Sequence, residues 1–351
     1  MLRPFAAPRF ESRASLVLLV LLAFTGCQHR AAGGERLYVS DERGDAVFAI
    51  DPETGGVTEQ IEAGRRPRGL ALSPDGATLY AALSGSPLGD ADERPSDRAA
   101  DGVAVIDLAT AKVRRVLPAG TDPAAIALSR DGRTLYVSDA EGDAVSKLPV
   151  DGSSAPRTVK VGEAPEGIAL SRDGKTLFVA CTASDQVAML DSQSLRPLRK
   201  ISVKGGPRGL LLSRDGDALY VSVESVGKLA ILSAADGKLR KTLDLARGKG
   251  EGKEDVRPMG MIEAPDGHLF VTTGRYGALL EVDPTGGMII RTIENVGTRP
   301  WGISLTADGA TLVTANGASG DVSLISRASG KIIRKLNVGK EPWGVAGGGA
   351  R

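Results

Sequence analysis

Arginine and tryptophan side chains recur beside evenly spaced prolines in this sequence. The residues concerned, with one glutamate, are Arg66, Arg68, Glu166, Arg208, Arg257, Arg299, Trp301 and Trp343. Guanidinium groups bind carboxylates and phosphates through paired hydrogen bonds, and indole rings stack on flat ligands. If the fold brings the prolines together, these side chains predict a ligand-binding site. The alternative is structural: the tryptophans would fill gaps between repeats, and the arginines would form surface pairs with Asp122, Glu166 and Glu341.

Residues for covalent or acid–base catalysis are sparse. The two histidines are His29, near the N-terminus, and His268, in an Asp-Gly-His turn where a solvated side chain is expected. Cys181 ends an apolar segment and is expected to be a buried small side chain. No nucleophile, base and orienting group can be assembled from these spacings, so we expect no catalytic residue, no metal site and no cofactor.

Prolines and Asp-Gly pairs divide the chain into repeats. Six prolines are each followed, nine residues later, by the glycine of an Asp-Gly pair: Pro67, Pro123, Pro165, Pro207, Pro258 and Pro300. A seventh, Pro342, opens the same pattern near the C-terminus. Most successive prolines are 42 residues apart, and two intervals are longer, with insertions at 84–101 and 247–256. Long loops on a rigid scaffold often carry function, and equally they can be neutral surface insertions.

Each repeat has the pattern of four short strands. A run such as GLALS (69–73) leads through an Asp-Gly turn to an apolar run such as TLYVS (134–138), and a charged, alternating strand such as 112–117 comes last. Repeated four-stranded units of this length predict a β-propeller. Once the N-terminal segment is set aside, the chain begins inside a unit at 36–40 and ends with a proline strand at 342–346. The last strand can therefore complete the first blade and close a ring of seven.

These repeats resemble a known family. LYVSD at 37–41 and LYVSDAEGDAV at 135–145, with the proline runs and Asp-Gly turns, are similar to the YVTN repeats of YncE-like propellers. The resemblance covers 35–347 and implies an all-β, seven-bladed propeller of four-stranded antiparallel blades in an exported protein. The fold also resembles propeller lactonases, which place His, Glu or a metal in the central channel. A propeller hosts many unrelated activities, so the resemblance implies little about function.

This architecture would place the residues beside the prolines at one end of the channel. The loop before each inner strand and the loop between the second and third strands share one face of such a propeller. Both insertions fall on that face. We therefore expect the arginines and tryptophans to surround the mouth of the channel.

The N-terminal segment has the features of an export signal. An arginine-containing start precedes the apolar run 16–24, and Cys27 follows two small residues, an arrangement that resembles a lipoprotein cleavage site. We expect Cys27 to be lipidated; the alternative is ordinary signal cleavage nearby. The predicted division is a lipoprotein-type signal peptide at 1–27, a flexible tether at 28–34, one propeller domain at 35–347 and a C-terminal tail at 348–351.

Charge composition narrows the functional classes. The sequence has 44 Lys and Arg against 43 Asp and Glu, so no basic excess points to nucleic acid. We expect an exported monomer on the periplasmic side of the envelope, attached to the outer membrane by its lipid. It would be a non-catalytic platform, not an enzyme, that binds an envelope protein or a small anionic ligand. The alternatives are a lactonase acting on a sugar lactone and a YncE-like binder of single-stranded DNA.

Overall fold

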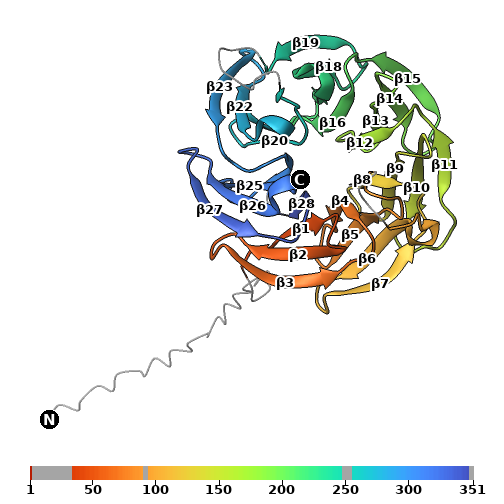
Figure 1. Ribbon diagram of the computed structural model, residues 1–351, viewed down its shortest axis with the longest axis horizontal. Coiled ribbons are helices and arrows are strands. Elements are labelled where there is room, and N and C mark those ends of the chain that lie inside the picture. Colours follow the sequence, from red (N-terminus) through yellow and green to blue (C-terminus); the bar gives the residue numbers. More distant parts are fainter. Residues whose placement is uncertain (2–33, 90–93, 247–254, 348–351) are drawn as a thin grey trace. The chain divides into compact units, whose positions relative to one another are not determined.

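The computed structural model describes Met1 and residues 34–89, 94–246 and 255–347. The expected signal peptide, tether and tail, apart from Met1 and Gly34, lie outside the described residues, as do 247–254 of the second insertion. From Glu35 onward, the described residues form seven four-stranded antiparallel sheets around a common axis (Figure 1). This confirms the all-β, seven-bladed propeller expected from the repeats.

Every blade contributes one strand to each of four concentric positions. The innermost strands are β28 (Pro342–Gly347), β4 (Pro67–Leu72), β8 (Pro123–Leu128), β12 (Pro165–Leu170), β16 (Pro207–Leu212), β20 (Met261–Glu263) and β24 (Pro300–Leu305). The second strands are β1 (Leu37–Asp41), β5 (Thr78–Leu83), β9 (Thr134–Asp139), β13 (Thr176–Cys181), β17 (Ala218–Val223), β21 (Leu269–Thr272) and β25 (Thr311–Asn316).

The outer half of each blade is built in the same way. The third strands are β2 (Ala46–Asp51), β6 (Gly102–Asp107), β10 (Ala144–Pro149), β14 (Gln186–Asp191), β18 (Lys228–Ser233), β22 (Leu279–Asp283) and β26 (Asp321–Ser326). The outermost strands are β3 (Gly56–Glu62), β7 (Lys112–Leu117), β11 (Arg157–Lys160), β15 (Pro197–Ser202), β19 (Leu239–Asp244), β23 (Met288–Ile293) and β27 (Ile332–Asn337). Single-turn 3₁₀ helices η1 (Arg98–Ala100), η2 (Glu224–Val226), η4 (Gly274–Tyr276) and η5 (Gly317–Ser319) lie between second and third strands. Within the described part of the chain, no helix is long and apolar enough to span a membrane.

The hydrophobic core lies between neighbouring blades. Seven clusters of buried apolar side chains occur in the described residues, and each combines two adjacent blades. The second strands are buried on both faces, which explains why segments such as β5 are almost continuously apolar. A fully buried leucine such as Leu79 contributes about 1.5–3 kcal/mol to folding. Outer strands such as β7 are largely exposed, as their alternating charges predict.

The two ends of the propeller share one blade. β28 pairs with β1, so this sheet has the order β28-β1-β2-β3, and one of the core clusters packs Leu37 and Val39 against Val313 and Leu324 of the last blade. Asp41 strengthens the closure because its carboxylate accepts backbone N–H bonds from Lys340 at 2.9 Å and from the next residue at 2.6 Å. The closure expected from the complementary ends is confirmed.

Hairpin turns explain the recurring Ser-x-Asp-Gly pattern. In the β4–β5 turn the Ser73 hydroxyl donates to the Asp75 carboxylate at 2.5 Å, and the same carboxylate accepts the N–H of Ala77 at 3.0 Å. Gly76 then takes a positive φ of 70°, which glycine adopts at little cost. The turn therefore fixes where each inner strand ends and the second strand begins.

Candidate functional site

The residue after six of the seven repeat prolines lies in an irregular stretch of an inner strand. In the β12–β13 pair, Pro165 faces Cys181 and Ile168 faces Val179, so the inner strand carries one extra residue. A bulge of this kind redirects side chains and is common beside functional sites. The extra residue lies at Glu166-Gly167, and β4, β8, β16, β24 and β28 show the same irregularity. The same sequence position thus lies in a bulge in blade after blade.

Backbone contacts hold these bulges in place. Hydroxyl groups from second strands donate to the carbonyl oxygens of four residues that follow the prolines or occupy the equivalent position. These pairs are Ser40 to Arg68 at 2.6 Å, and Ser138 to Glu166, Ser222 to Met259 and Thr272 to Trp301 at 2.8 Å each. The glycine that follows allows neighbouring inner strands to approach closely, because an added Cβ at Gly167 would overlap the carbonyl oxygen of Arg208. The serine of the TLYVS pattern therefore positions the site.

A cavity of about 190 Å³ lies among the inner strands. Its charged lining consists of Glu166 and Arg208, and the remaining lining is mostly apolar, with Met259 and the indoles of Trp301 and Trp343. The indoles meet edge to face, with ring centroids 6.5 Å apart and an interplanar angle of 64°. Both tryptophans are half-buried. They line the cavity and do not simply fill gaps between blades.

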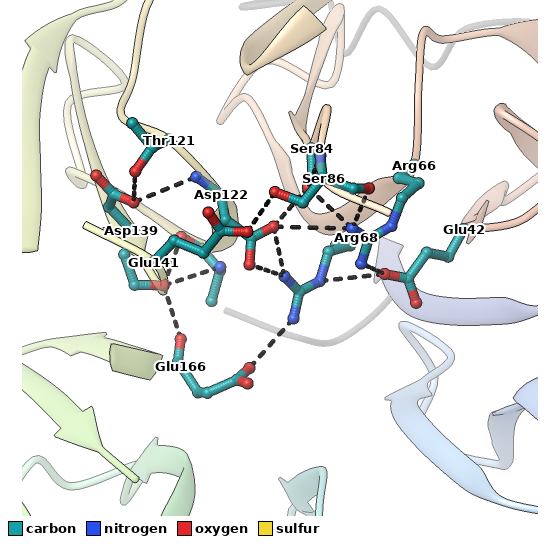
Figure 2. Close-up of polar contacts among 12 residues, drawn as sticks. Glu42, Arg66, Arg68, Ser84, Ser86, Thr121, Asp122, Asp139, Glu141 and Glu166 are labelled. Carbon is teal, nitrogen blue, oxygen red and sulfur yellow. Dashed lines mark hydrogen bonds and ion pairs between the residues drawn. The ribbon is translucent and has the colours of Figure 1, made fainter. Parts of the chain in front are cut away.

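A continuous network of charged and polar side chains includes Glu166, which also lines this cavity (Figure 2). Arg68 is at its centre, 3.3 Å from Glu166, 3.4 Å from Asp122 and 3.5 Å from Glu42. The Arg68 guanidinium also lies 5.4 Å from the centroid of the Trp343 ring. These partners come from three other blades, so Arg68 joins distant parts of the ring.

Two further arginines extend the network. Arg66 donates to Glu42 at 2.7 Å and to the backbone carbonyl of Ser86, in the first insertion, at 2.6 Å. Arg208 lies 2.8 Å from Glu224 and 3.5 Å from Glu166. The arginines and Glu166 are thus paired, as the structural alternative from the sequence predicted, but they are paired in a largely buried network instead of on an open surface.

The network keeps Glu166 ionised. Burial alone would raise the pKa of this carboxyl, but the guanidinium groups of Arg208, Arg68 and Arg66 bring its pKa below the ordinary value. The same ion pairs raise the pKa of the arginine. Burial lowers the pKa of Arg68, but the carboxylates of Glu166, Glu42 and Asp122 raise it above the ordinary value. The site therefore presents a carboxylate and a guanidinium side by side in a small, partly apolar cavity.

The remaining residues predicted for the site lie outside the cavity lining. Arg257 is half-buried and donates to the backbone carbonyl of Ser225 at 2.6 Å, whereas Arg299 is exposed. Neither has a carboxylate partner among the described residues. Glu341 does not pair with these arginines; it lies 3.0 Å from Arg43 at the ring closure.

Two other chemically capable residues, His268 and Cys181, do not line this cavity. His268 lies in the β20–β21 turn, at the opposite end of the inner strand, and its Nδ1 is 3.1 Å from Glu281. Cys181 is fully buried, and burial raises the pKa of its thiol to about 11. In the described residues, no group of His, Cys, Asp and Glu side chains is arranged to hold a metal ion. A larger cavity of about 420 Å³ lies between two blades and away from the axis; its lysines, Lys160 and Lys200, are exposed.

Sequence reasoning missed two carboxylates of the network. Glu42 and Glu224 both follow a second strand, two residues after the hydroxyls of Ser40 and Ser222. Ser84 occupies the same repeat position, and its hydroxyl donates to Asp122 at 2.5 Å. An alignment of the seven repeats with one another would have shown that the residue after the second strand is polar in these three blades.

Comparisons with known proteins agree on the fold. A family model described as Lactonase, 7-bladed beta-propeller matches residues 99–195, and no curated protein matches the chain. The periplasmic gluconolactonase PpgL of Pseudomonas aeruginosa is 22% identical with a TM-score of 0.72, over 89% of this chain and 98% of that one. A Bacteroides fragilis protein provisionally described as a 6-phosphogluconolactonase is 17% identical with a TM-score of 0.72, over 90% and 99%. Virginiamycin B lyase of Staphylococcus aureus is 14% identical with a TM-score of 0.63, over 88% and 91%.

These findings correct two expectations from the sequence. The lactonase family model and the lactonase structures contradict a non-catalytic binding platform, and with it the expectation that the chain is not an enzyme. They favour the lactonase alternative. The sequence argument failed because it searched for catalytic groups close together along the chain, whereas the cavity combines residues from separate blades.

Proposed function

We propose that this protein hydrolyses a sugar lactone in the axial cavity. The observation that carries the proposal is the ionised carboxylate of Glu166 beside the Arg208 guanidinium, 3.5 Å away, in a cavity lined by two indoles. The match of residues 99–195 to a lactonase family model supports it, because Glu166 lies in the matched segment. Lactone hydrolysis needs a base for water and a positive group for the carbonyl oxygen, and both are present.

The cavity suggests a role for each side chain. The apolar face of the lactone ring packs on the indoles of Trp301 and Trp343. Arg208 donates an N–H to the lactone carbonyl oxygen, and Glu166 accepts a proton from a water molecule as its oxygen attacks the carbonyl carbon. Arg208 stabilises the resulting oxyanion. The ring C–O bond then breaks, the leaving oxygen takes the proton from Glu166, and the product is an open hydroxy acid.

The depressed pKa of Glu166 limits this chemistry to reactive esters. A carboxylate whose pKa lies well below the working pH is a weak base, so it gives less rate enhancement than a group that titrates near neutrality. A strained or activated cyclic ester requires less assistance than an amide or an ordinary ester. The proposal therefore favours lactones over other carboxylic acid derivatives.

Hydrolysis of glucono-1,5-lactone by the purified protein tests the proposal. Acid release is followed with a pH indicator after subtraction of the spontaneous rate, for the wild type and for Glu166→Gln. Saturable turnover that the substitution largely removes supports the proposal. No acceleration over the spontaneous rate with several five- and six-membered sugar lactones would refute it.

We also propose that the chain is exported, lipidated at Cys27 and related to YncE-like repeat proteins. The export signal and the small residues before Cys27 support the first two points, and the YVTN-like repeats support the third. Metabolic labelling with a palmitate analogue tests lipidation: label on the wild type and none on Cys27→Ser is expected. Equal labelling of both proteins would exclude this site.

A further inference from the structure

We infer that the substrate is an uncharged, single-ring sugar lactone and not a phosphorylated one. This inference rests on the proposed function and specifies the substrate class of the same cavity. It follows from the balance of charges around Glu166, the size of the cavity and the surroundings of Arg257 and Arg299, which have no carboxylate partner among the described residues.

In the described charge network beside the cavity, every guanidinium is already paired with at least one carboxylate. Three guanidinium groups face four carboxylates in one connected network, a formal net charge of −1. The members are Arg66, Arg68, Arg208, Glu42, Asp122, Glu166 and Glu224. Each guanidinium lies within 3.5 Å of at least two carboxylates or of one carboxylate and a backbone carbonyl. A phosphate here would meet net like charge and would have to displace an existing partner.

The size and lining of the cavity indicate the same class of ligand. Its volume of about 190 Å³ lies below the range of roughly 300–1,000 Å³ that is typical of pockets for larger ligands. The lining beyond Glu166 and Arg208 is mostly aromatic, aliphatic and glycine backbone. One neutral ring with hydroxyl groups suits this lining, and a phosphate on that ring would have to project out of the cavity.

Of the arginines predicted for the site, Arg257 and Arg299 have no carboxylate partner among the described residues. Arg257 is held by its bond to the carbonyl of Ser225, and neither Arg257 nor Arg299 lines the cavity. Arg299 is exposed to solvent, where the attraction between one guanidinium and a phosphate is weak and is screened by salt. The inferred ligand is therefore neutral, whereas the sequence predicted an anionic ligand. The difference arises because most of the arginines that suggested an anion are paired with carboxylates.

Competing lactones provide the direct test. The kcat/KM of the full protein is measured for glucono-1,5-lactone and for its 6-phosphate, each corrected for spontaneous hydrolysis. We expect the neutral lactone to be preferred by about 10-fold or more, because like charges at a site cost several kcal/mol. A preference for the phosphate ester would overturn the inference and leave the proposed function intact. Hydrolysis of neither lactone would refute the proposed function and this inference with it.

The dependence of kcat/KM on ionic strength shows whether the site repels or attracts the phosphate group. Salt screens charge interactions, so kcat/KM for the 6-phosphate should rise with added NaCl, whereas the value for the neutral lactone should stay constant. A fall for the 6-phosphate would indicate a cationic subsite and contradict the inference. Substitution Arg299→Ala would then test whether Arg299 belongs to that subsite.

Binding without turnover gives an independent measurement. The two tryptophans of the sequence both line the cavity, so intrinsic fluorescence reports on it directly. Gluconolactam, a neutral analogue that is not hydrolysed, should change the emission, and its 6-phosphate should do so at concentrations about 10-fold higher or more. Tighter binding of the phosphorylated lactam would contradict the inference even if no turnover were seen.

A charge-removing variant completes the test. Glu224→Gln removes one carboxylate of the network and should narrow the difference in kcat/KM between the two lactones. Asp217→Asn removes one carboxylate that pairs with Arg240 in another part of the blade, and it should leave the difference unchanged. An equal effect of both variants, or no effect of either, would show that the network charge does not set the preference.

Discussion

Replacing Glu166 by glutamine tests the base and the charge network together. The substitution keeps the shape of the side chain and removes its charge and its capacity to accept a proton from water. General-base catalysis contributes about 10²–10⁴-fold, and the depressed pKa of Glu166 favours the lower end of that range. We therefore expect kcat to fall by about 100-fold, which corresponds to about 2.7 kcal/mol, with little change in KM.

The same substitution should lower the free energy of unfolding by a moderate amount. The Glu166 carboxylate lies 3.3 Å from Arg68 and 3.5 Å from Arg208, and each contact is worth about 5 kcal/mol of attraction at an effective dielectric constant near 20. Desolvation of the buried groups opposes this attraction. Both guanidiniums keep another carboxylate, Glu42 or Glu224, so neither is left unpaired. The loss should be about 1.5–3 kcal/mol, below the 3–5 kcal/mol expected when a buried charge loses its last partner.

The assay combines initial rates with urea unfolding. Rates on glucono-1,5-lactone are compared for the wild type, Glu166→Gln and the matched control Glu224→Gln, which removes a partner of Arg208 but no residue lining the cavity. The control should lose less than about 10-fold in kcat. The reasoning is refuted if Glu166→Gln retains activity within about 3-fold of wild type, or if the two variants lose equal activity.

Three further outcomes follow from the same contacts. Trp301→Leu should raise KM by about 2- to 12-fold, from the 0.5–1.5 kcal/mol of aromatic packing, with kcat nearly unchanged; a loss confined to kcat would exclude a stacking role. Ser138→Ala removes the hydroxyl that holds the Glu166 carbonyl at 2.8 Å and should lower the free energy of unfolding by about 1–3 kcal/mol in urea, together with kcat; an unchanged kcat would show that this bond does not position the site. Because the folded-state pKa of Glu166 lies below its ordinary value of 4.5, its stabilising contribution and its basic form are present above pH 4.5 and are lost as pH falls through the folded pKa. A pH–kcat profile should be flat from about pH 5 to 7, and a decline centred near neutrality would indicate a different base.

The fold could be predicted from sequence because its signals are local and repeated. The Ser-x-Asp-Gly turn uses contacts within five residues, as Ser73 and Asp75 show, and the same turn recurs every 42 residues in most of the chain. The lengths of individual strands were harder to predict. β11 has four residues where most outer strands have six, and it begins just after Pro156, which lacks the N–H that a ladder requires.

The site could be predicted only in part. The position after the proline is defined by the repeat, so Glu166, Arg208, Trp301 and Trp343 could be assigned to the channel before the structure was known. Their partners could not, because long side chains reach across blades. Arg68 contacts Glu166, 98 residues away, and no periodicity in the sequence records that pairing.

The bulged inner strands have an evolutionary consequence. Each bulge is held through its backbone, by a hydroxyl from a second strand or by close contact at a glycine, and its side chain takes no part in these bonds. The backbone therefore provides equivalent side-chain positions in successive blades, and the bonds that hold each bulge do not depend on the side chain at that position. A duplicated blade would add another such side-chain position. Single-codon changes at these positions could alter the substrate without a change in the propeller fold. Related chains with different residues at these positions can share the propeller fold and differ in the reaction that they catalyse.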